Sequence, residues 1–458
     1  RPADQPDRRP DDQRDGEPLQ SLLHVTVEHD RDDDAEDDRS DEHGAGLREV
    51  PPVRMQVERN RLVVVEQLLR VWHGTRQYRG GVDAAALLAD LDEDQRRAVT
   101  TESTLVAVIA GAGSGKTRVL TRRVAYRLGT ETADARHTMV LTFTRDAAGE
   151  LRRRLFHLGL TDQITAGTFH SIAHQLLRQR WADRDETPRT IVNDRARIVA
   201  GLNEFGRGAS RADLDAVVQE MSVASARGLS ADGYLQAARR GDFRTLLDPE
   251  FVAGVLRAYQ AAKRERRVVD LDDLLMLTID ALERDPQFAD AVRWRFRHLL
   301  VDEAQDLNPL QHRLVELMSG DRGDLFLVGD PAQAIYGFTG SDPSLLIEVA
   351  DRFPGVEVVR LPTNHRCTPQ VVDAGRHVLR QSSVDTLIDS GRADGPAVVI
   401  RSHGDEHAEA DTVAIAIALS DPGLVRHGRV AVLARTHATL GPIRAALESA
   451  GVAVRRRA

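Results

Sequence analysis

The sequence predicts an α/β fold: a parallel sheet around a glycine-rich loop, an inserted all-helical segment, and the start of a second α/β domain. Three observations predict it. From about Leu87 onward, short apolar runs alternate with segments of helical periodicity, which is the pattern of βαβ units. One apolar run, Thr104–Ile109, leads directly into a glycine-rich turn and an amphipathic helix. From 184 to 270 the pattern is helical throughout, without a strand signal.

Changes in this pattern divide the chain into five expected segments. These are a mostly disordered acidic tail (1–84), the first part of an α/β domain (85–183), the helical insertion (184–270), the rest of that α/β domain (271–355), and a second α/β domain that is incomplete where the sequence ends (356–458). The tail is rich in Asp, Arg and Pro and has too little apolar surface to offset the entropy lost on ordering. The first methionine is Met55, so we expect part of the tail to lie outside the native product.

The composition excludes several classes of protein. With 458 residues, 41% hydrophobic and 29% charged, the chain reads as a soluble globular protein of several domains. The single cysteine, Cys367, excludes an internal disulfide framework and favours a reducing, cytoplasmic location. No apolar stretch is long enough to cross a membrane. The net charge of −9 comes from the acidic tail. The nearly neutral remainder argues neither for nor against nucleic acid.

The glycine-rich turn has the features of a phosphate-binding loop. Its residues are Ala110, Gly111, Ala112, Gly113, Ser114, Gly115, Lys116 and Thr117. Glycines let backbone N–H groups close on phosphate oxygens, and the start of the next helix adds partial positive charge. Lys116 can reach the β- and γ-phosphates, and the Thr117 hydroxyl can bind Mg²⁺. The chain uses Arg at nearly every basic position, so a lysine here favours a nucleotide site over a glycine-rich turn that binds nothing.

A second chemical signal lies where apolar strands end in polar residues. The run His298–Val301 leads straight into Asp302, which is where a fold with a phosphate-binding loop places the carboxylate that organises Mg²⁺. The adjacent Glu303 could polarise an attacking water. A further predicted strand ends before Asp330 and Gln333. The alternative is a surface acidic turn without a ligand.

Taken together, these motifs resemble the UvrD/Rep/PcrA family of superfamily 1 DNA helicases from about Leu87 to Val452. The matching segments are Ala110–Thr117, Thr142–Thr144, Gly167–Ser171, Asp270–Leu274, Val301–Asp306, Gly329–Phe338 and Asn364–Arg366. The resemblance implies two RecA-like motor domains that bind ATP and Mg²⁺ between them, each with an inserted helical subdomain. It also implies 3′-to-5′ movement on single-stranded DNA and unwinding at junctions of single and double strands, with repair or recombination partners that the sequence does not identify.

The resemblance also implies residue roles, position by position. For the nucleotide, Gln95 would contact adenine, Arg118 and His365 would join the site, Lys116 and Thr117 would hold phosphates and Mg²⁺, and Asp302 would complete the metal site. For hydrolysis, Glu303 would activate water, Gln333 would sense the γ-phosphate, and Arg366 would be the arginine finger. For DNA, Thr142, Phe143, His170 and Phe338 would line the single-strand track. The three ring side chains could instead be buried core residues.

Three departures from the family pattern qualify this expectation. Thr339 stands where the family usually has Arg, and His365 stands where it usually has Tyr. The sequence also ends before the family's last motifs, including a second arginine finger worth roughly 10³–10⁵ in turnover. We therefore expect the chain to bind ATP but to hydrolyse it poorly and not to unwind DNA alone. The alternatives are a nucleotide- or DNA-binding module, a helicase–nuclease subunit, or another P-loop ATPase such as a transporter subunit or a kinase.

Overall fold

The computed structural model describes residues 21–25, 84–160, 164–205, 210–321, 323–337, 340–380 and 388–456. They divide into two compact units. The larger unit spans Gly80–Val399, and the smaller one comprises the described residues from Ile400 onward together with strand β1 (Ser21–Val25). Every residue singled out for the nucleotide site belongs to the larger unit.

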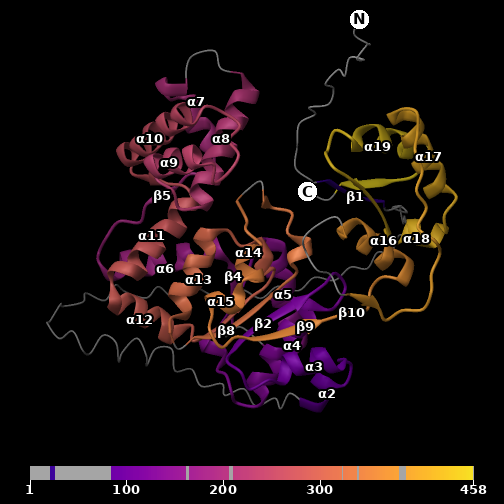
Figure 1. The fold of residues 1–458 in the computed structure, drawn as a ribbon, viewed down its shortest axis with the longest axis horizontal. Coiled ribbons are helices and arrows are strands. Elements are labelled where there is room, and N and C mark those ends of the chain that lie inside the picture. Colours follow the sequence, from indigo (N-terminus) through magenta and orange to yellow (C-terminus); the bar gives the residue numbers. More distant parts are fainter. Residues whose placement is uncertain are drawn as a thin grey trace, which may run out of the picture. The chain divides into compact units, whose positions relative to one another are not determined.

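A six-stranded sheet forms the centre of the larger unit (Figure 1). It is parallel, as the sequence predicts. Its strands are β2 (Leu105–Ala110), β3 (Thr138–Thr142), β4 (Thr165–Thr168), β7 (His298–Val301), β8 (Asp324–Gly329) and β9 (Glu357–Leu361). Their order is β4-β3-β7-β8-β2-β9, and every neighbouring pair is parallel. Because the strands are parallel, their carboxyl ends share one edge, where ligands bind in such folds.

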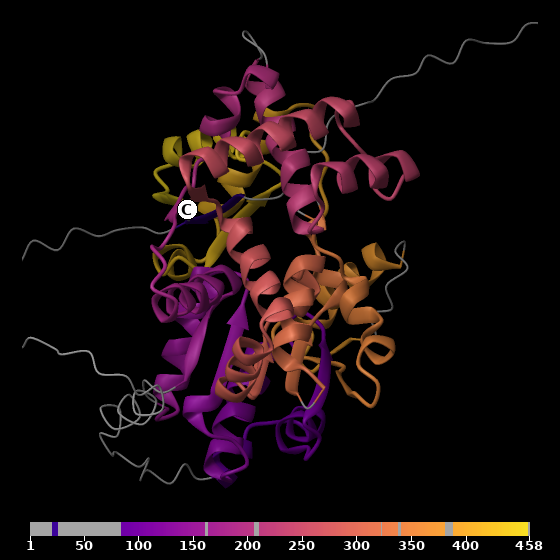
Figure 2. The same ribbon diagram turned by 90° about the vertical axis from the view of Figure 1, so that its left-hand side faces the viewer.

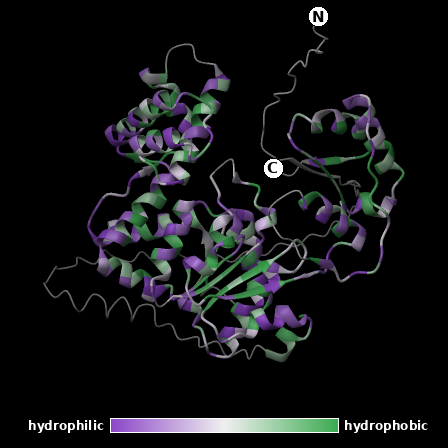
Figure 3. Ribbon diagram, viewed as in Figure 1, coloured by the Kyte–Doolittle hydropathy of each residue, from purple (hydrophilic) through white to green (hydrophobic). Residues whose placement is uncertain are grey.

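Helices cover both faces of the sheet because alternate strand residues point to opposite sides. On one face, side chains such as Val108, Val140 and Phe326 pack under α3 (Glu93–Thr100), α4 (Lys116–Gly129) and α5 (Arg145–His157). On the other face, side chains such as Met139, Leu299 and Leu325 pack under α6 (Phe169–Asp183), α11 (Leu271–Arg284), α12 (Pro286–Arg295) and α13 (Pro309–Ser319). The strands are accordingly the hydrophobic centre of the ribbon in Figure 3.

Between α6 and α11 the chain forms a separate group of helices, α7 (Arg195–Ala200), α8 (Arg211–Ala226), α9 (Ala231–Arg240) and α10 (Pro249–Arg266). They share their own core, which includes Val217, Met221, Tyr234 and Tyr259, and they are the magenta-to-pink group in Figures 1 and 2. The sequence predicts no strand here. The structure nevertheless pairs two short strands in parallel, β5 (Thr190–Ile191) and β6 (Val268–Val269), where the chain enters and leaves this group.

Three strands expected from the sequence differ from those in the structure, and the first two differ in their place or length. The strand expected to open the second domain at 356 is β9, which pairs with β2 as the last strand of the first sheet. Of the run Gln163–Phe169, expected as one strand, Gln163 lies outside the described residues. The strand itself ends at Thr168, because Thr168 accepts the N–H of Ser171 and starts helix α6 at Phe169.

Ala397–Ile400, also expected as a strand, is irregular, and Ile400 is 92% exposed. Its residues favour a strand, but a strand also needs a backbone partner, and none of the described strands pairs with it.

The rest of the larger unit comprises short elements around the sheet. They include α2 (Ala84–Leu88), α14 (Ser344–Ile347), α15 (Val349–Arg352), β10 (Thr363–Asn364), α16 (Pro369–Leu379) and β11 (Asp389–Ser390). Strands β10 and β11 pair in parallel just beyond β9. Asn364, His365 and Arg366 follow β9 closely, so the sheet itself helps to place them near the glycine-rich loop.

The smaller unit is a three-stranded sheet with helices. Strand β1 lies between β12 (Val430–Ala434) and β13 (Val454–Arg456) and is antiparallel to both. Helices α17 (Glu406–Ala418), α18 (Pro422–Arg426) and α19 (Leu440–Ser449) supply its core. Most of the predicted disordered tail, 1–84, lies outside the described residues, but β1 within it is a strand. No helix in the described part of the chain has the length and apolar character needed to cross a bilayer.

Candidate functional site

The glycine-rich loop connects β2 to α4 at the carboxyl edge of the sheet. Gly113 and Gly115 have φ values of 72° and 89°, a left-handed conformation that glycine adopts at little cost. The buried Ser114 hydroxyl donates to the Gly111 carbonyl over 2.7 Å and holds the turn closed. Helix α4 starts at Lys116, so its first N–H groups and the positive end of its dipole lie beside the loop. This arrangement suits an anionic phosphate.

Lys116 is the positively charged residue of this loop, and its charge affects the acidic residues that follow strand β7. Its ammonium group lies 3.4 Å from the Ala110 carbonyl, and its charge acts to lower the pKa values of Asp302 and Asp306. Thr117 follows in the first turn of α4. Arg118, which the family resemblance places with the nucleotide residues, pairs with Asp90 over 3.2 Å on the surface.

Gln95 lies directly against the loop. Its side-chain amide donates to the Ser114 carbonyl over 2.8 Å, and its backbone N–H is capped by Asp92 at the start of α3. The side chain is only 1% exposed, so an adenine could reach it only after the covering residues moved. The side-chain oxygen of Gln95 also accepts the Asp92 N–H over 3.4 Å. One amide N–H and one oxygen lone pair therefore remain, which is the pair that an adenine edge requires.

Asp302 and Glu303 follow β7 at the same edge. Burial and the neighbouring Glu303 raise the pKa of Asp302 to about 7, against the opposing effects of the Glu303 N–H and Lys116. The Glu303 N–H donates to the Asp302 carboxylate over 3.1 Å. Glu303 has a φ of 53°, a left-handed conformation that is strained for a residue with a side chain.

Asp302 and the Thr117 hydroxyl fit the ligands that Mg²⁺ takes when it is bound with a nucleotide. Mg²⁺ uses few protein oxygens and completes its shell with phosphates and water. Among the described residues, no group of three or more His, Cys, Asp or Glu side chains could hold a metal ion by itself. Asp302 is buried with a strongly raised pKa, and a cation beside it would favour its charged form.

Sequence reasoning missed Gln305, which links two strand tips. Its side-chain nitrogen donates to Glu303 over 2.9 Å, and its oxygen accepts the backbone N–H of Asp330 over 2.9 Å. Asp330 in turn accepts from the side chain of Gln333 over 2.5 Å. Glu303 and Gln333, predicted separately, therefore belong to one hydrogen-bonded chain that runs through Gln305. The only signal in the sequence was the position of Gln305 within Val301–Asp306.

Asp306 was also not singled out from the sequence. Burial and the nearby Glu303 raise the pKa of its carboxyl group to about 7. One of its carboxylate oxygens is buried without a hydrogen-bond partner among the described residues. Lys116, Asp302, Glu303 and Asp306 thus influence one another electrostatically, which places them around one site.

The segment after β9 lies against the glycine-rich loop. The Asn364 side chain donates to the Ala112 carbonyl over 2.7 Å, and the His365 N–H donates to the Gly113 carbonyl over 2.9 Å. His365 also places its imidazole 2.7 Å from Asp92, the residue that caps the helix of Gln95. Arg366 is exposed, and its guanidinium has no hydrogen bond or ion pair to any described residue.

The residues predicted to contact DNA differ in how far they are buried. Phe143 is half-buried, and its ring centroid lies 5.0 Å from that of Tyr336, which the sequence analysis did not identify. Thr142 is fully buried, so its side chain is not at the surface. His170 is half-buried, 4.0 Å from Asp272, and burial lowers its pKa although Asp272 and Asp270 act in the opposite direction. Phe338 and Thr339 lie outside the described residues.

Comparison with known proteins identifies relatives of this chain. Residues 91–354 match the model of the UvrD/REP helicase N-terminal domain. The chain is 35% identical over 384 residues to the ATP-dependent DNA helicase UvrD2 of Mycobacterium tuberculosis, covering 80% of this chain and 55% of the relative. It is 32% identical over 310 residues to PcrA of Staphylococcus epidermidis, covering 65% of this chain and 41% of the relative.

DNA helicase II of Escherichia coli is 31% identical over 307 residues, covering 66% of this chain and 42% of the relative. The chain therefore spans about half the length of the relatives it matches. The family match includes the glycine-rich loop, Asp302 and Gln333, and ends just before β9.

Proposed function

The chain belongs to the UvrD/REP helicase family, and from that premise we propose that it works as an ATP-dependent DNA helicase or translocase. Its substrate would be single-stranded DNA and junctions of single and double strands, with movement from 3′ to 5′. The observation that carries this proposal is the convergence of Lys116, Asp302 and Glu303 at the carboxyl edge of one parallel sheet. Relatives of the chain are named ATP-dependent DNA helicases.

The proposed roles follow from charge and position. Lys116 and the N–H groups at the start of α4 would hold the phosphates of ATP, and Thr117 and Asp302 would hold Mg²⁺, which offsets phosphate charge when bound. Glu303 would accept a proton from the attacking water, oriented by Gln305. Gln333 would sense the γ-phosphate through the same hydrogen-bonded chain. Arg366 would bring positive charge to the phosphates from the segment that already lies on the loop.

Phe143 and Tyr336 support a DNA contact near this site. Aromatic rings bind single strands by stacking on bases, which tolerates any sequence. Burial and the charges of Asp306 and Glu303 raise the pKa of Tyr336. The Phe143–Tyr336 pair is thus electrostatically close to the carboxylates proposed for hydrolysis. That proximity offers a direct physical route by which DNA could affect hydrolysis.

The proposal is tested by comparing the wild-type chain with Lys116→Ala and Lys116→Arg. Binding of Mg²⁺ and a fluorescent ATP analogue is measured first, then ATP hydrolysis with and without single-stranded DNA, then unwinding of duplexes with a 3′ or a 5′ tail. We expect nucleotide binding by the wild type and a loss of at least tenfold in both variants. Absence of wild-type binding would overturn the proposal. Binding of nucleotide and DNA without hydrolysis would instead favour a binding module.

A further inference from the structure

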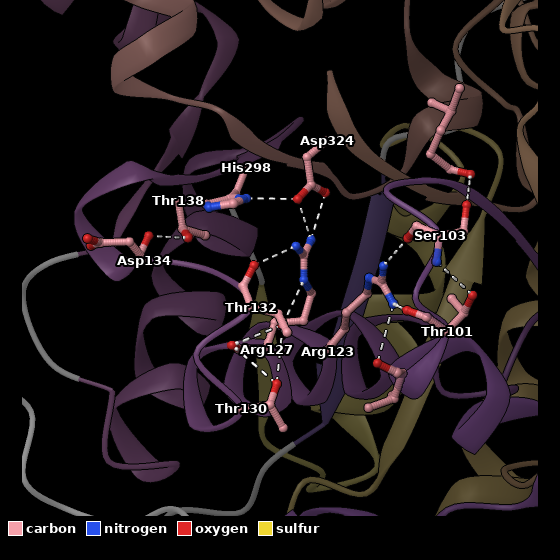
Figure 4. Close-up of polar contacts among 12 residues, drawn as sticks. Thr101, Ser103, Arg123, Arg127, Thr130, Thr132, Asp134, Thr138, His298 and Asp324 are labelled. Atoms are coloured by element: carbon pink, nitrogen blue, oxygen red, sulfur yellow. Dashed lines mark hydrogen bonds and ion pairs between the residues drawn. The ribbon is translucent and has the colours of Figure 1, made fainter. Parts of the chain in front are cut away.

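Arg123 is a buried cation on the inner face of α4, about two turns after Lys116. Arg123 is 1% exposed, and its guanidinium donates to four backbone carbonyls, three of them through one nitrogen. Figure 4 shows its bonds to Thr101 and Ser103. The acceptors are Ala98 (3.1 Å), Val99 (3.3 Å), Thr101 (3.2 Å) and Ser103 (2.8 Å). All four carbonyls belong to the last turn of α3 or to the residues just after it.

The position suits a cation for two reasons. The carboxyl end of a helix carries partial negative charge, and its last carbonyls lack partners within the helix. Burial, with a smaller effect of Arg127, lowers the pKa of Arg123 to about 10, so the side chain stays charged at neutral pH. A lysine at this position would keep the charge, but it lacks the planar fork that serves several acceptors at once.

The other end of α3 is attached to the glycine-rich loop. Asp92 caps the helix, and Gln95 in its first turn donates to the Ser114 carbonyl over 2.8 Å. Helix α3 has only eight residues, so the two attachments are about 12 Å apart. The loop is also continuous with α4, the helix that carries Arg123. The contacts therefore form a closed ring: loop, α4, Arg123, α3, Gln95, and back to the loop.

We propose that Arg123 is a positioning residue of the nucleotide site. By fixing the end of α3, it holds Gln95 against the Ser114 carbonyl and so keeps the loop in the shape that binds phosphate. The inference rests on the proposed function, because it assumes that this loop binds ATP. In the described part of the chain, the Arg123 guanidinium contacts the four backbone carbonyls and lies over the Phe326 ring of β8, 4.9 Å from its centroid. Its effect on the loop would pass through α3.

Arg127 offers a matched control within the same helix. It lies one turn after Arg123 and pairs with Asp324 of β8 over 2.6 Å, and Asp324 also lies 2.8 Å from His298 of β7. Its second nitrogen donates to the Thr132 carbonyl over 2.9 Å. Arg127 thus anchors α4 to the amino ends of β7 and β8, and its hydrogen bonds and ion pairs to the described residues do not include α3 (Figure 4). The same substitution at both positions therefore separates two effects. One is a general weakening of the contacts that hold α4 in place, and the other is a weakening of the contacts between α4 and the end of α3.

The test uses the full chain and four variants: Arg123→Lys, Arg127→Lys, Gln95→Ala and the double variant Arg123→Lys with Gln95→Ala. Affinity for a fluorescent ATP analogue with Mg²⁺ is measured by titration, and stability by urea unfolding. We expect Arg123→Lys to weaken binding about tenfold, which corresponds to about 1.4 kcal/mol, and Arg127→Lys to change it less than twofold. Both variants should lower the unfolding midpoint. The double variant should bind as weakly as Gln95→Ala, and no more weakly.

Three results would overturn the inference. Arg123→Lys could bind the ATP analogue as tightly as the wild type, or Arg127→Lys could lose as much affinity as Arg123→Lys. The double variant could also show the product of the two single losses of affinity. Should Arg123→Lys not fold, Glu357→Gln loosens the same end of α3, because Glu357 accepts from Arg97 and Thr101. A threefold loss of affinity is expected there, and an unchanged affinity would count against the inference. A wild-type chain that binds no nucleotide would overturn the proposed function together with this inference.

Discussion

The side chain of Gln305 donates a hydrogen bond to the carboxylate of Glu303 over 2.9 Å. Gln305 is almost fully buried, and its oxygen is held by the backbone N–H of Asp330, the next strand tip. Glu303 has a left-handed backbone conformation that costs about 1–2 kcal/mol for a residue with a side chain. The bond from Gln305 is therefore a contact that fixes where the proposed water-activating carboxylate points.

We expect Gln305→Ala to reduce ATP hydrolysis by about tenfold to hundredfold, because a misplaced catalytic group loses most of its advantage. Nucleotide affinity should change less than threefold, since Gln305 does not belong to the phosphate-binding loop. Single-turnover hydrolysis and titration with a fluorescent ATP analogue measure the two effects separately. Gln311→Ala is the matched control, because Gln311 is equally buried but caps α13. Equal losses in both variants would contradict the assigned role.

Gly113→Ala should damage the loop in two ways. An alanine at φ 72° is strained, and its Cβ would lie 2.6 Å from the side-chain oxygen of Asn364. We expect the free energy of unfolding to fall by about 1–2 kcal/mol and nucleotide affinity to fall at least tenfold. Urea unfolding and nucleotide titration provide the two readings.

Gly149→Ala is the control for this substitution. Gly149 lies in α5, where an added Cβ meets nothing within 4 Å, so a helix-favouring alanine should stabilise the chain by about 0.5–1 kcal/mol. Its nucleotide affinity should equal that of the wild type. If Gly113→Ala behaved like Gly149→Ala, the loop would not depend on its left-handed glycines.

The sequence anticipates the parts of this molecule that local pattern determines. The strand His298–Val301 is found as predicted, because its apolar run is bounded by charged residues. Parallel strands then bring Asp302 to the same edge as the glycine-rich loop. The bond between Gln305 and Asp330 could not be foreseen, because it depends on how β7 and β8 align. The contact between His365 and Asp92 joins residues 273 positions apart, and it depends on β9 pairing with β2.

The sequence also does not predict two strand pairings, because these too depend on residues that are distant in the sequence. Val268–Val269 and Ser21–Val25 are short, and only a partner distant in the sequence makes them strands. Ala397–Ile400 has the stronger strand composition but no partner among the described strands. Local propensity predicts where a strand is possible, whereas backbone pairing decides where one forms.

Without nucleotide and Mg²⁺, stability should fall as the pH rises from about 4 to about 7. The pKa of Asp302 is raised by burial to about 7, from an ordinary value of 3.8, so the folded chain binds this proton more tightly than the unfolded chain does. The protonated Asp302 therefore contributes fully to the stability of the folded chain below about pH 4, and this contribution is lost as the pH rises through about 7. Urea unfolding of Asp302→Asn should lack this contribution, leaving the variant more stable than the wild type at pH 8 by a few kcal/mol at most.

The same variant gives an opposite result when ligand is present. Mg²⁺ with ATP should stabilise the wild type at pH 8 by mass action and should stabilise Asp302→Asn much less, because the amide carries no charge to offer the metal. Identical pH profiles for the two proteins without ligand would show that Asp302 is not a buried carboxylate with a raised pKa. Asp306 titrates in the same range, so the difference between the proteins, rather than either profile alone, is the quantity to compare.

Phe143→Ala should weaken binding of single-stranded DNA by about tenfold, since stacking of one base on one ring contributes about 1–3 kcal/mol. Tyr336→Ala should have a similar effect and Tyr336→Phe almost none, because the ring rather than the hydroxyl stacks on bases. Fluorescence anisotropy with a labelled oligonucleotide of mixed sequence measures the affinity, and nucleotide titration should be unchanged. Phe156→Ala is the control, because Phe156 is 63% exposed on α5 and no aromatic ring but His157 lies against it in the described chain. Equal affinities of Phe143→Ala and Phe156→Ala for DNA would place the single-strand track elsewhere.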